Sequence, residues 1–514
     1  MRHIVAIEIG SSKIKGALAS VDSDTTLNVL AVEEMPVDGI VRHGRVQNVQ
    51  EVANTIRQII QRLEQSPDIS PASISMAYIS YGGRSYHSVA TTGTLHMPTE
   101  TQITEVSIKR LIEEARYNIA TGYDVDTLLP KLYKVDNTAV ANVVGTYGNT
   151  LYGEFTALVC APDNKRNIDR VKITSTTGRE IKRAYVARIV ALCDMLMTND
   201  DRQRGCLLAD CGAETTTVAI YKGGVLLHVA TLPIGGNNIT MDLCAAMNMT
   251  HDNAELNKRS KGVAMVDRDA GETTDKSALD INDIVQPRAG EIAANIINQI
   301  AIAGIKITDL GAGIIISGGA AALTNFDLLI KKQCGLEVRC ASADLPGIAI
   351  CNRYVKASEH IDVISLMLYA ARNFADDCVA MPAETAPEPR VETFAAPVGP
   401  EPAPAGRRQP DEDTLLEDDD YDDDHATATA KRKAEEKKNK NKKHRKAEEE
   451  QQRYRAEDAS YPGNAHDEPD GTDDDGTDDD DTDDDDTSKR LGLLSRLGRK
   501  VTDFFTTAPD DDMD

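Results

Sequence analysis

The sequence contains no tryptophan and only six phenylalanines, and aromatic residues make up 4% of its 514 positions. Nine cysteines are present without a CxxC pair, and several of them lie in apolar runs. This usage favours buried free thiols in a reducing cytoplasm over a disulfide framework or a zinc site. No apolar run reaches the ~20 residues of a membrane-spanning helix, and no secretory signal precedes the first predicted strand.

Charge is distributed unequally along the chain, whose formal net charge is −26. Residues 376–514 carry 42 acidic and 20 basic residues, a net charge of −22, whereas residues 1–375 carry 41 and 37, a net charge of −4. The first part has an ordinary globular composition and is long enough for two domains with sizeable cores. The acidity of the whole chain therefore says nothing about a ligand of the folded part.

One stretch, Leu207–Tyr221, consists of an apolar run, a turn containing an acid and a glycine, three threonines and a second apolar run. It predicts a β-hairpin whose turn suits phosphate, because glycine permits close backbone approach, hydroxyls donate, and Asp210 can hold hydrated Mg²⁺. A single Asp-x-Gly turn is more often an ordinary hairpin. A second stretch, Ile4–Gly16, has the same design, with Glu8 before Gly10. The pair predicts a duplicated domain with one phosphate loop in each half.

Apolar strands alternate with amphipathic helices around both stretches and predict a layered α/β fold. Residues 84–155 interrupt this alternation and predict an inserted subdomain. A helix is predicted at Arg183–Met197, before the second hairpin. Two glycine pairs, Gly235–Gly236 and Gly318–Gly319, each stand between a predicted strand and a helix. Such a turn suits a phosphate or an adenine ring, and equally a plain strand–helix connection.

Three further motifs follow along the chain. They are AExxKxxGxA at Ala254–Ala264, a PR-x-x-E helix at Pro287–Glu291 and SGGAA at Ser317–Ala321. With the two loops and the insertion, they resemble the actin/chaperone/sugar-kinase superfamily and, within it, the FtsA family of bacterial actin-like division proteins. A first loop with Glu8 is typical of that family. The resemblance covers about residues 1–375 and returns at the extreme C-terminus.

The resemblance implies a two-lobed actin-like ATPase fold of duplicated RNase H-like domains, with ATP and Mg²⁺ in the cleft. The first loop would hold the phosphates, the second would lie opposite, and Asp210 would hold Mg²⁺ through water. Glu255 and Lys258 would meet the ribose or adenine, although their spacing on a helix also suits a surface ion pair. The implied nucleotide-binding residues are Gly10, Ser11, Ser12, Lys13, Asp210, Gly212, Thr215, Thr216, Gly236, Glu255, Lys258, Gly318 and Gly319.

The second loop departs from the family's usual DxGGGTTD pattern. Ala213 and Glu214 replace two glycines, and Thr217 replaces the trailing acid. Glu214 would place a carboxylate beside phosphates, which is unfavourable unless it points away or meets Mg²⁺ or Lys13. We therefore expect ATP binding with at most weak ATPase activity, and assign no catalytic residue.

The resemblance also implies protein partners. The inserted subdomain would make contacts within a protofilament, so that the chain self-associates. A lobe with the PR-x-x-E helix would bind the C-terminal peptide of the tubulin-like FtsZ through Asp242, Arg288 and Glu291. Other division proteins are expected as partners. No nucleic acid is expected, because the basic run at Lys431–Lys446 is interleaved with acids and suits a solvated segment.

Residues 376–487 combine Pro/Ala-rich sequence with acidic and basic runs, and have too few apolar residues to offset the entropy of folding. We expect a disordered linker there. Residues 488–507 differ, because apolar residues recur at helical spacing with basic residues beside them, which predicts an amphipathic helix on an anionic membrane. The FtsA family ends in such a helix. Its membrane-contacting residues would be Leu491, Leu494, Arg496, Leu497, Arg499, Lys500, Val501, Phe504 and Phe505.

The resemblance, together with the terminal amphipathic helix, implies an actin-like, ATP-binding cell division protein that polymerises at the cytoplasmic face of the inner membrane and anchors the FtsZ ring at the division site. It would be a peripheral membrane protein. A sugar-type kinase, a DnaK-type chaperone and a pilus-assembly ATPase of the same superfamily are the alternatives. The expected domains are 1–83 and 156–205 for lobe 1, 84–155 for the insertion, 206–375 for lobe 2, 376–487 for the linker, 488–507 for the helix and 508–514 for an acidic tail.

Overall fold

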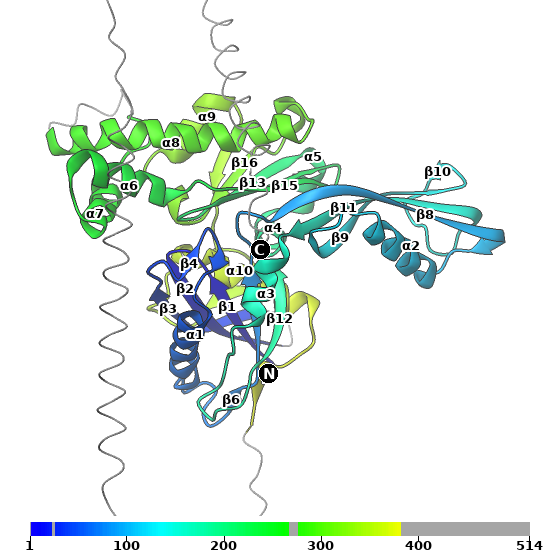
Figure 1. The fold of residues 1–514 in the computed structure, drawn as a ribbon, viewed down its shortest axis with the longest axis horizontal. Helices are drawn as coiled ribbons and strands as arrows, with labels where there is room; N and C mark the ends of the chain where they lie inside the picture. The colour runs from blue at the N-terminus through cyan, green and yellow to red at the C-terminus, as the bar shows by residue number, and fades with distance from the viewer. Residues whose placement is uncertain (1, 23–25, 267–275, 382–514) are drawn as a thin grey trace, which may run out of the picture. The chain divides into compact units, whose positions relative to one another are not determined.

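Three large sheets organise residues 2–22, 26–266 and 276–381, the part of the chain that the computed structural model describes (Figure 1). The first sheet has six strands in the order β12-β7-β1-β2-β3-β18. Helices α1 (Val49–Glu64) and α10 (Ile361–Asn373) pack on it. Its strands are β1 (Arg2–Ile9), β2 (Lys13–Val21), β3 (Leu27–Pro36), β7 (Met76–Tyr81), β12 (Lys182–Ala187) and β18 (Ile348–Ile350).

The second sheet has five strands in the order β15-β14-β13-β16-β17. Helix α8 (Lys276–Ile302) packs with α6 (Gly236–Met247), α7 (His251–Lys261) and α9 (Phe326–Cys334). Buried residues of these helices and of the sheet form one apolar cluster. The strands are β13 (Cys206–Cys211), β14 (Thr216–Lys222), β15 (Val225–Leu232), β16 (Ile314–Ser317) and β17 (Val338–Cys340).

The first two sheets repeat one topology. In each, the first three strands form an antiparallel meander, and two later strands lie parallel beside the first, as β3-β2-β1-β7-β12 and β15-β14-β13-β16-β17. Both predicted hairpins are present, closed by the pairs Ile9–Ile14 and Cys211–Thr216. The predicted α/β class and its duplication are therefore confirmed.

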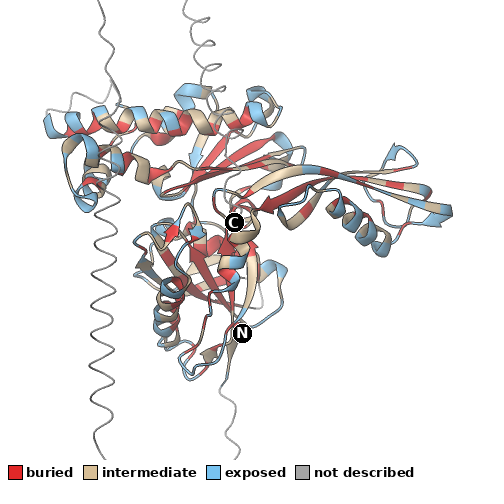
Figure 2. Cartoon of the chain, in the orientation of Figure 1, coloured by how far each residue is buried: buried red, intermediate tan, exposed pale blue. Residues whose placement is uncertain are grey.

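Burial explains why these segments become central strands and covering helices. All six residues of β13 are buried, which matches its apolar run and includes the charged Asp210 (Figure 2). Helix α1 instead buries one face, including Ile56, Ile59 and Leu63, so its 3–4 spacing places a single stripe on the sheet. The Asn48 side chain accepts a hydrogen bond from the N–H of Glu51 and caps the first turn.

The third sheet lies within the predicted insertion and has the order β10-β9-β11-β8. Helix α2 (Glu105–Tyr117) packs on it and buries Leu111 and Ala115. Strand β11 runs without interruption across residue 155, where the sequence places the end of the insertion. The strands are β8 (His87–Gln102), β9 (Asp124–Val135), β10 (Thr138–Ala139) and β11 (Tyr147–Cys160).

One predicted helix is wrong in its first part. Arg183–Met197 begins as β12, which pairs in parallel with β7, and becomes α4 (Arg188–Leu196) only at Arg188. Both β18 and α10 pack with the first sheet. The sequence-based division had assigned their residues, within 206–375, to lobe 2. The remaining short elements are β4 (Val41–Arg42), β5 (Arg45–Val46), β6 (Ser73–Ile74), β19 (Val379–Ala380), α3 (Pro162–Asp169), α5 (Asn199–Arg204), η1 (Ile307–Asp309), η2 (Gly319–Ala322) and η3 (Ala357–Glu359).

The predicted linker, the terminal amphipathic helix and the acidic tail lie outside the described residues. Within the described ranges, no helix is both long and apolar enough to cross a membrane.

Candidate functional site

The two glycine loops have the same turn geometry. The Gly10 N–H donates to the Lys13 carbonyl at 3.1 Å, and the Gly212 N–H donates to the Thr215 carbonyl at 2.8 Å. Each loop follows a largely buried strand whose second-to-last residue is an acid, Glu8 in β1 and Asp210 in β13. The duplicated topology thus supplies two equivalent loops, each with a carboxylate at its base.

Arg188 joins these two carboxylates. Its Nη1 donates to Glu8 Oε1 at 2.6 Å, and its Nε lies 2.9 Å from Asp210 Oδ2. Burial raises the pKa of Glu8 to about 7 and also raises the pKa of Asp210, although Arg188 opposes both shifts. Burial acts to lower the pKa of Arg188, but its two carboxylate partners hold it above the ordinary value. The guanidinium therefore stays charged between the two loops.

A second ion pair stands beside this bridge. Lys15 Nζ lies 2.7 Å from Asp362 Oδ2, and Lys15 is the cross-strand partner of Glu8. Burial acts to lower the pKa of Lys15, but Asp362 and Glu8 hold it above the ordinary value. The five side chains combine three carboxylates with two cations, so the cluster has a formal charge of −1 when all are ionised. Buried charges need such pairing because desolvation is costly.

Glu214, the departure in the second loop, is directed at the β4–β5 hairpin. Its Oε2 accepts the His43 N–H at 2.6 Å, and its Oε1 lies 3.2 Å from the Arg42 guanidinium. The Gly44 N–H of the same hairpin donates to Ser11 Oγ of the first loop at 2.8 Å. The hairpin thus contacts both loops, and the Glu214 carboxylate has partners other than Lys13.

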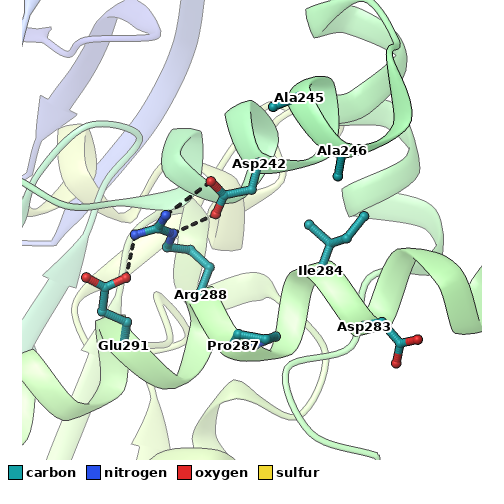
Figure 3. Close-up of a pocket in the computed structure, with 8 residues that line it drawn as sticks. All are labelled: Asp242, Ala245, Ala246, Asp283, Ile284, Pro287, Arg288 and Glu291. Atoms are coloured by element: carbon teal, nitrogen blue, oxygen red, sulfur yellow. Dashed lines mark hydrogen bonds and ion pairs between the residues drawn. The ribbon is translucent and has the colours of Figure 1, made fainter. Parts of the chain in front are cut away.

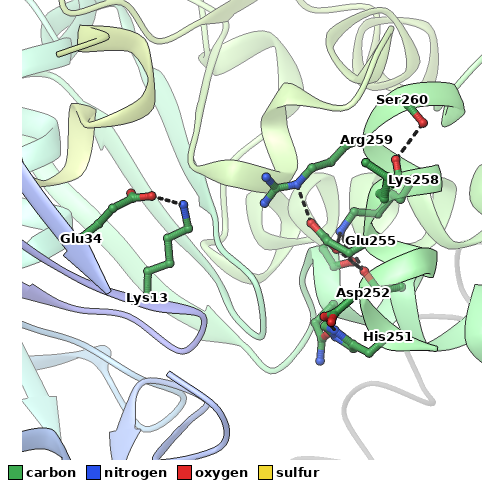
Figure 4. Close-up of polar contacts among 12 residues, drawn as sticks. Lys13, Glu34, His251, Asp252, Glu255, Lys258, Arg259 and Ser260 are labelled. Carbon is green, nitrogen blue, oxygen red and sulfur yellow. Dashed lines mark hydrogen bonds and ion pairs between the residues drawn. The ribbon is translucent and has the colours of Figure 1, made fainter. Parts of the chain in front are cut away.

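Glu255 and Lys258 contact each other on α7 (Figure 4), and Lys258 also contacts Gly236 of the Gly235–Gly236 turn. Lys258 Nζ donates to Glu255 Oε2 at 2.6 Å, to Thr240 Oγ1 at 2.9 Å and to the Gly236 carbonyl at 3.0 Å. Burial acts to raise the pKa of Glu255, but Lys258 and its hydrogen bonds hold it at about 2. This is a half-buried network that ties α7 to the N-terminus of α6, which is more than a surface ion pair.

The SGG turn contacts the second loop directly. Gly318 has φ +88°, and a Cβ there would lie 2.4 Å from the Cys211 carbonyl and 2.8 Å from Asp210 Oδ1. Only glycine fits this approach. A Cβ at Gly319 would meet nothing within 4 Å, so the backbone next to it borders open space. The turn therefore brings an open backbone surface beside Asp210.

Two side chains that were predicted to bind phosphate, those of Lys13 and Thr216, instead donate hydrogen bonds to other protein groups. The Lys13 ammonium donates to Glu34 and is directed at it in Figure 4. The Thr216 hydroxyl donates to the Ile234 carbonyl at 2.8 Å and is fully buried. Thr215 is also buried, and the Ser12 carbonyl accepts the Val37 N–H at 3.0 Å. The side chains of Lys13 and Thr216 are therefore bound to other parts of the protein in this structure.

Direct binding of a divalent cation to Asp210 Oδ2 would displace Arg188, whereas Mg²⁺ held by Asp210 through water stays a prediction. One oxygen of Asp210 is paired with Arg188, and the other lies close to Gly318. Among the described residues, no group of three or more His, Cys, Asp or Glu side chains is placed to hold a metal ion. The cations beside the second loop and the Gly235–Gly236 turn are Arg188 and Lys258, and both attract anions.

A pocket of about 550 Å³ lies between α6 and α8 and contains the three residues expected to bind a peptide (Figure 3). Arg288 forms a bidentate ion pair with Asp242, to which its Nε donates at 2.6 Å and its Nη2 at 3.1 Å, and its Nη1 donates to Glu291. The pocket is lined by Asp242, Ala245, Ala246, Asp283, Ile284, Pro287, Arg288 and Glu291. With three acids and one base, it has a formal charge of −2 and an apolar floor.

Reasoning from the sequence missed Arg188, because it placed this residue inside a continuous helix. The tyrosine and β-branched residues that precede Arg188 signalled a strand and hence a strand–helix junction. Arg42, His43 and Thr240 were missed as well. No sequence signal marks them, because their roles depend on a β-hairpin and a helix N-terminus meeting loops far away in the chain.

Comparison with known structures agrees with the observed architecture. The PilM-PilN type IV pilus biogenesis complex matches with a TM-score of 0.52 at 15% identity, over 72% of this chain and 98% of that one. The duplicated sheets, the paired acid–glycine loops and this match define a mixed α/β protein with the actin-like ATPase fold.

Sequence comparison finds similarity to the FtsA cell division proteins. The cell division protein FtsA of Porphyromonas gingivalis is 28% identical over 384 residues, 72% of this chain and 78% of that protein. FtsA of Escherichia coli is 24% identical over 358 residues, 65% of this chain and 83% of that protein. The sequence profile of the family "Cell division protein FtsA" matches residues 207–361. The chain is a homologue of the FtsA cell division proteins.

Proposed function

We propose that this chain is an ATP-binding scaffold of cell division, which polymerises at the inner membrane and anchors the FtsZ ring to it. It acts at the division site as a peripheral protein on the cytoplasmic face. FtsA homology and the actin-like fold support this role. Turnover of ATP is slow or absent in this proposal, because Arg188 occupies Asp210 Oδ2 and Glu214 and Thr217 depart from the family's second loop.

The observation that carries the proposal is the pocket between α6 and α8. The resemblance to the FtsA family implies Asp242, Arg288 and Glu291 for peptide binding, and these residues form one hydrogen-bonded group in the pocket. The negative charge and the apolar floor suit a short peptide that has an apolar side chain next to a basic one. We assign this pocket to the C-terminal peptide of FtsZ.

Peptide binding by the full chain tests this assignment. Fluorescence anisotropy with a labelled FtsZ C-terminal peptide should show saturable binding, which Arg288→Glu weakens at least tenfold. Lys331→Glu makes the same charge change on α9, where Lys331 pairs with the exposed Glu337, and should bind as the unsubstituted chain does. Equal binding by both variants would remove the pocket from the proposal.

The nucleotide is proposed to lie against the two glycine loops, the Gly235–Gly236 turn and the SGG turn. The open surface at Gly319 suits adenine, and Lys258 suits the ribose or a phosphate. Asp210→Ala should weaken ATP binding, because it frees Arg188 from the second loop. Unchanged ATP affinity in this variant would show that the site lies elsewhere.

Membrane attachment is assigned to residues 488–507. Truncation before Ser488 should release the protein from anionic liposomes in a pelleting assay. A matched truncation after Thr507 removes only the acidic end and should leave the protein bound at least as tightly, since repulsion from the anionic surface is reduced. If the chain truncated before Ser488 still pellets with the liposomes, the terminal helix is not the tether.

A further inference from the structure

Arg188 lies where the two halves of the duplicated fold present their carboxylates. Its Nε and Nη1 contact Asp210 and Glu8, which come from equivalent strands of the two sheets. Within the described residues, no hydrogen bond engages its Nη2, and 18% of the side-chain surface is exposed. The guanidinium is therefore held by the carboxyl groups of Asp210 and Glu8 and keeps donors for an anionic ligand.

Charge counting shows what this cation does to the site. Without Arg188, the three carboxylates of Glu8, Asp210 and Asp362 would face the single ammonium of Lys15, giving a formal charge of −2. Such a site would repel phosphates and would need a divalent cation beside it. With Arg188 the formal charge is only −1, and Glu8 and Asp210 each have a cationic partner.

We propose that Arg188 is the resident cation of the nucleotide site, so that this chain binds ATP without a requirement for Mg²⁺. The proposal rests on the proposed nucleotide binding and specifies how it is achieved. The guanidinium takes over the neutralisation of the two acids and offers its remaining N–H groups to a phosphate. Arginine suits this task because its planar fork contacts several oxygens at once and stays protonated.

The neighbouring groups favour a permanent bridge over one that Mg²⁺ displaces. Asp210 and Glu8 hold the pKa of Arg188 above its ordinary value against the opposing effect of burial. A magnesium ion would have to break the contact at 2.9 Å to reach Asp210 Oδ2. The displaced guanidinium, 18% exposed, would then keep Glu8 as its one ion-pair partner among the described residues. The Lys15–Asp362 pair on the flank adds no free carboxylate for an ion.

Equilibrium binding of ATP to the full chain, with and without Mg²⁺, tests the proposal. Calorimetric titrations in excess Mg²⁺ and in EDTA at matched ionic strength give a ratio of two dissociation constants. For the unsubstituted chain we expect a ratio below about three. For Arg188→Met, which keeps the side-chain length but removes the charge, we expect a ratio above about ten.

Arg188→Lys serves as the second variant, because it keeps a charge that reaches one carboxylate at a time. Its ratio should fall between the other two, and circular dichroism reports whether each variant is folded. A ratio above ten for the unsubstituted chain overturns the proposal, and so does a ratio near one for folded Arg188→Met. Absence of ATP binding under every condition would instead refute the proposed nucleotide function itself.

Discussion

Glu214 in the second loop holds the backbone of His43, whose N–H donates to its carboxylate at 2.6 Å. The residue that departs most from the family pattern is thus directed at the β4–β5 hairpin, whose Gly44 also binds Ser11 of the first loop. One short hairpin therefore connects the two glycine loops. This contact explains how an acid is accommodated beside a proposed phosphate site.

Glu214→Ala should loosen the hairpin without unfolding the protein. The substitution removes a charge-assisted hydrogen bond, of a kind that contributes about 1.5–3 kcal/mol, from the His43 N–H. Hydrogen exchange followed by mass spectrometry should show at least tenfold faster exchange in a peptide covering residues 41–46. Glu113→Ala, an exposed position on α2, is the control and should leave this peptide unchanged.

Gly318→Ala should be much more destabilising than a comparable glycine substitution. Its Cβ would lie 2.4 Å from the Cys211 carbonyl at a φ of +88°, so the SGG turn must move away from Asp210. Gly335→Ala is the matched control, because Gly335 has φ +72° but no atom within 4 Å of an added Cβ. We expect a loss of about 1 kcal/mol for Gly335→Ala and of more than about 3 kcal/mol for Gly318→Ala in chemical unfolding.

A similar loss for both variants would mean that backbone strain alone decides the effect. The close approach of the SGG turn to the second loop would then carry no measurable free energy, contrary to the site described above.

Glu8 should make stability fall as pH rises. Burial raises the pKa of Glu8 from 4.5 to about 7 in the folded chain, so the folded state retains a proton that the unfolded state loses. Between pH 5 and pH 8 this difference should cost about 2–3 kcal/mol of unfolding free energy. Glu8→Gln keeps an acceptor for Arg188 but cannot ionise, so its stability should decline less over this range.

The measurement is chemical unfolding of both proteins at pH 5 and pH 8. The change in unfolding free energy between the two pH values is compared between the unsubstituted chain and Glu8→Gln, and the difference is the contribution of Glu8. Parallel pH profiles for the two proteins would show that Glu8 ionises normally in the folded state.

The duplicated core could be predicted from sequence because its signals are local. An apolar run, an acid, a glycine and hydroxyl residues recur in Ile4–Gly16 and Leu207–Tyr221, and both became hairpins with the same turn. The stripe of apolar residues in α1 is likewise a local pattern. Short-range periodicity is sufficient for elements of this kind.

The electrostatics of the site could not be predicted in the same way. Arg188, Glu8 and Asp210 are far apart in sequence, and only the strand–helix junction at Arg188 brings the guanidinium to both acids. The apolar residues around Arg188 fit either a strand or a helix, so periodicity could not locate the junction. The residues of the α6–α8 pocket were selected by resemblance to a family, and periodicity alone would have left Arg288 as a surface cation.

Recruitment of FtsZ to a membrane tests the central claim most directly. Fluorescent FtsZ and anionic vesicles are mixed with the full chain, with Arg288→Glu, or with the chain truncated before Ser488, and vesicle-bound fluorescence is measured. We predict that FtsZ coats the vesicles only with the unsubstituted chain, because one variant lacks the peptide pocket and the other lacks the tether. If the unsubstituted chain covers the vesicles and FtsZ stays in solution, the chain is not an FtsZ anchor.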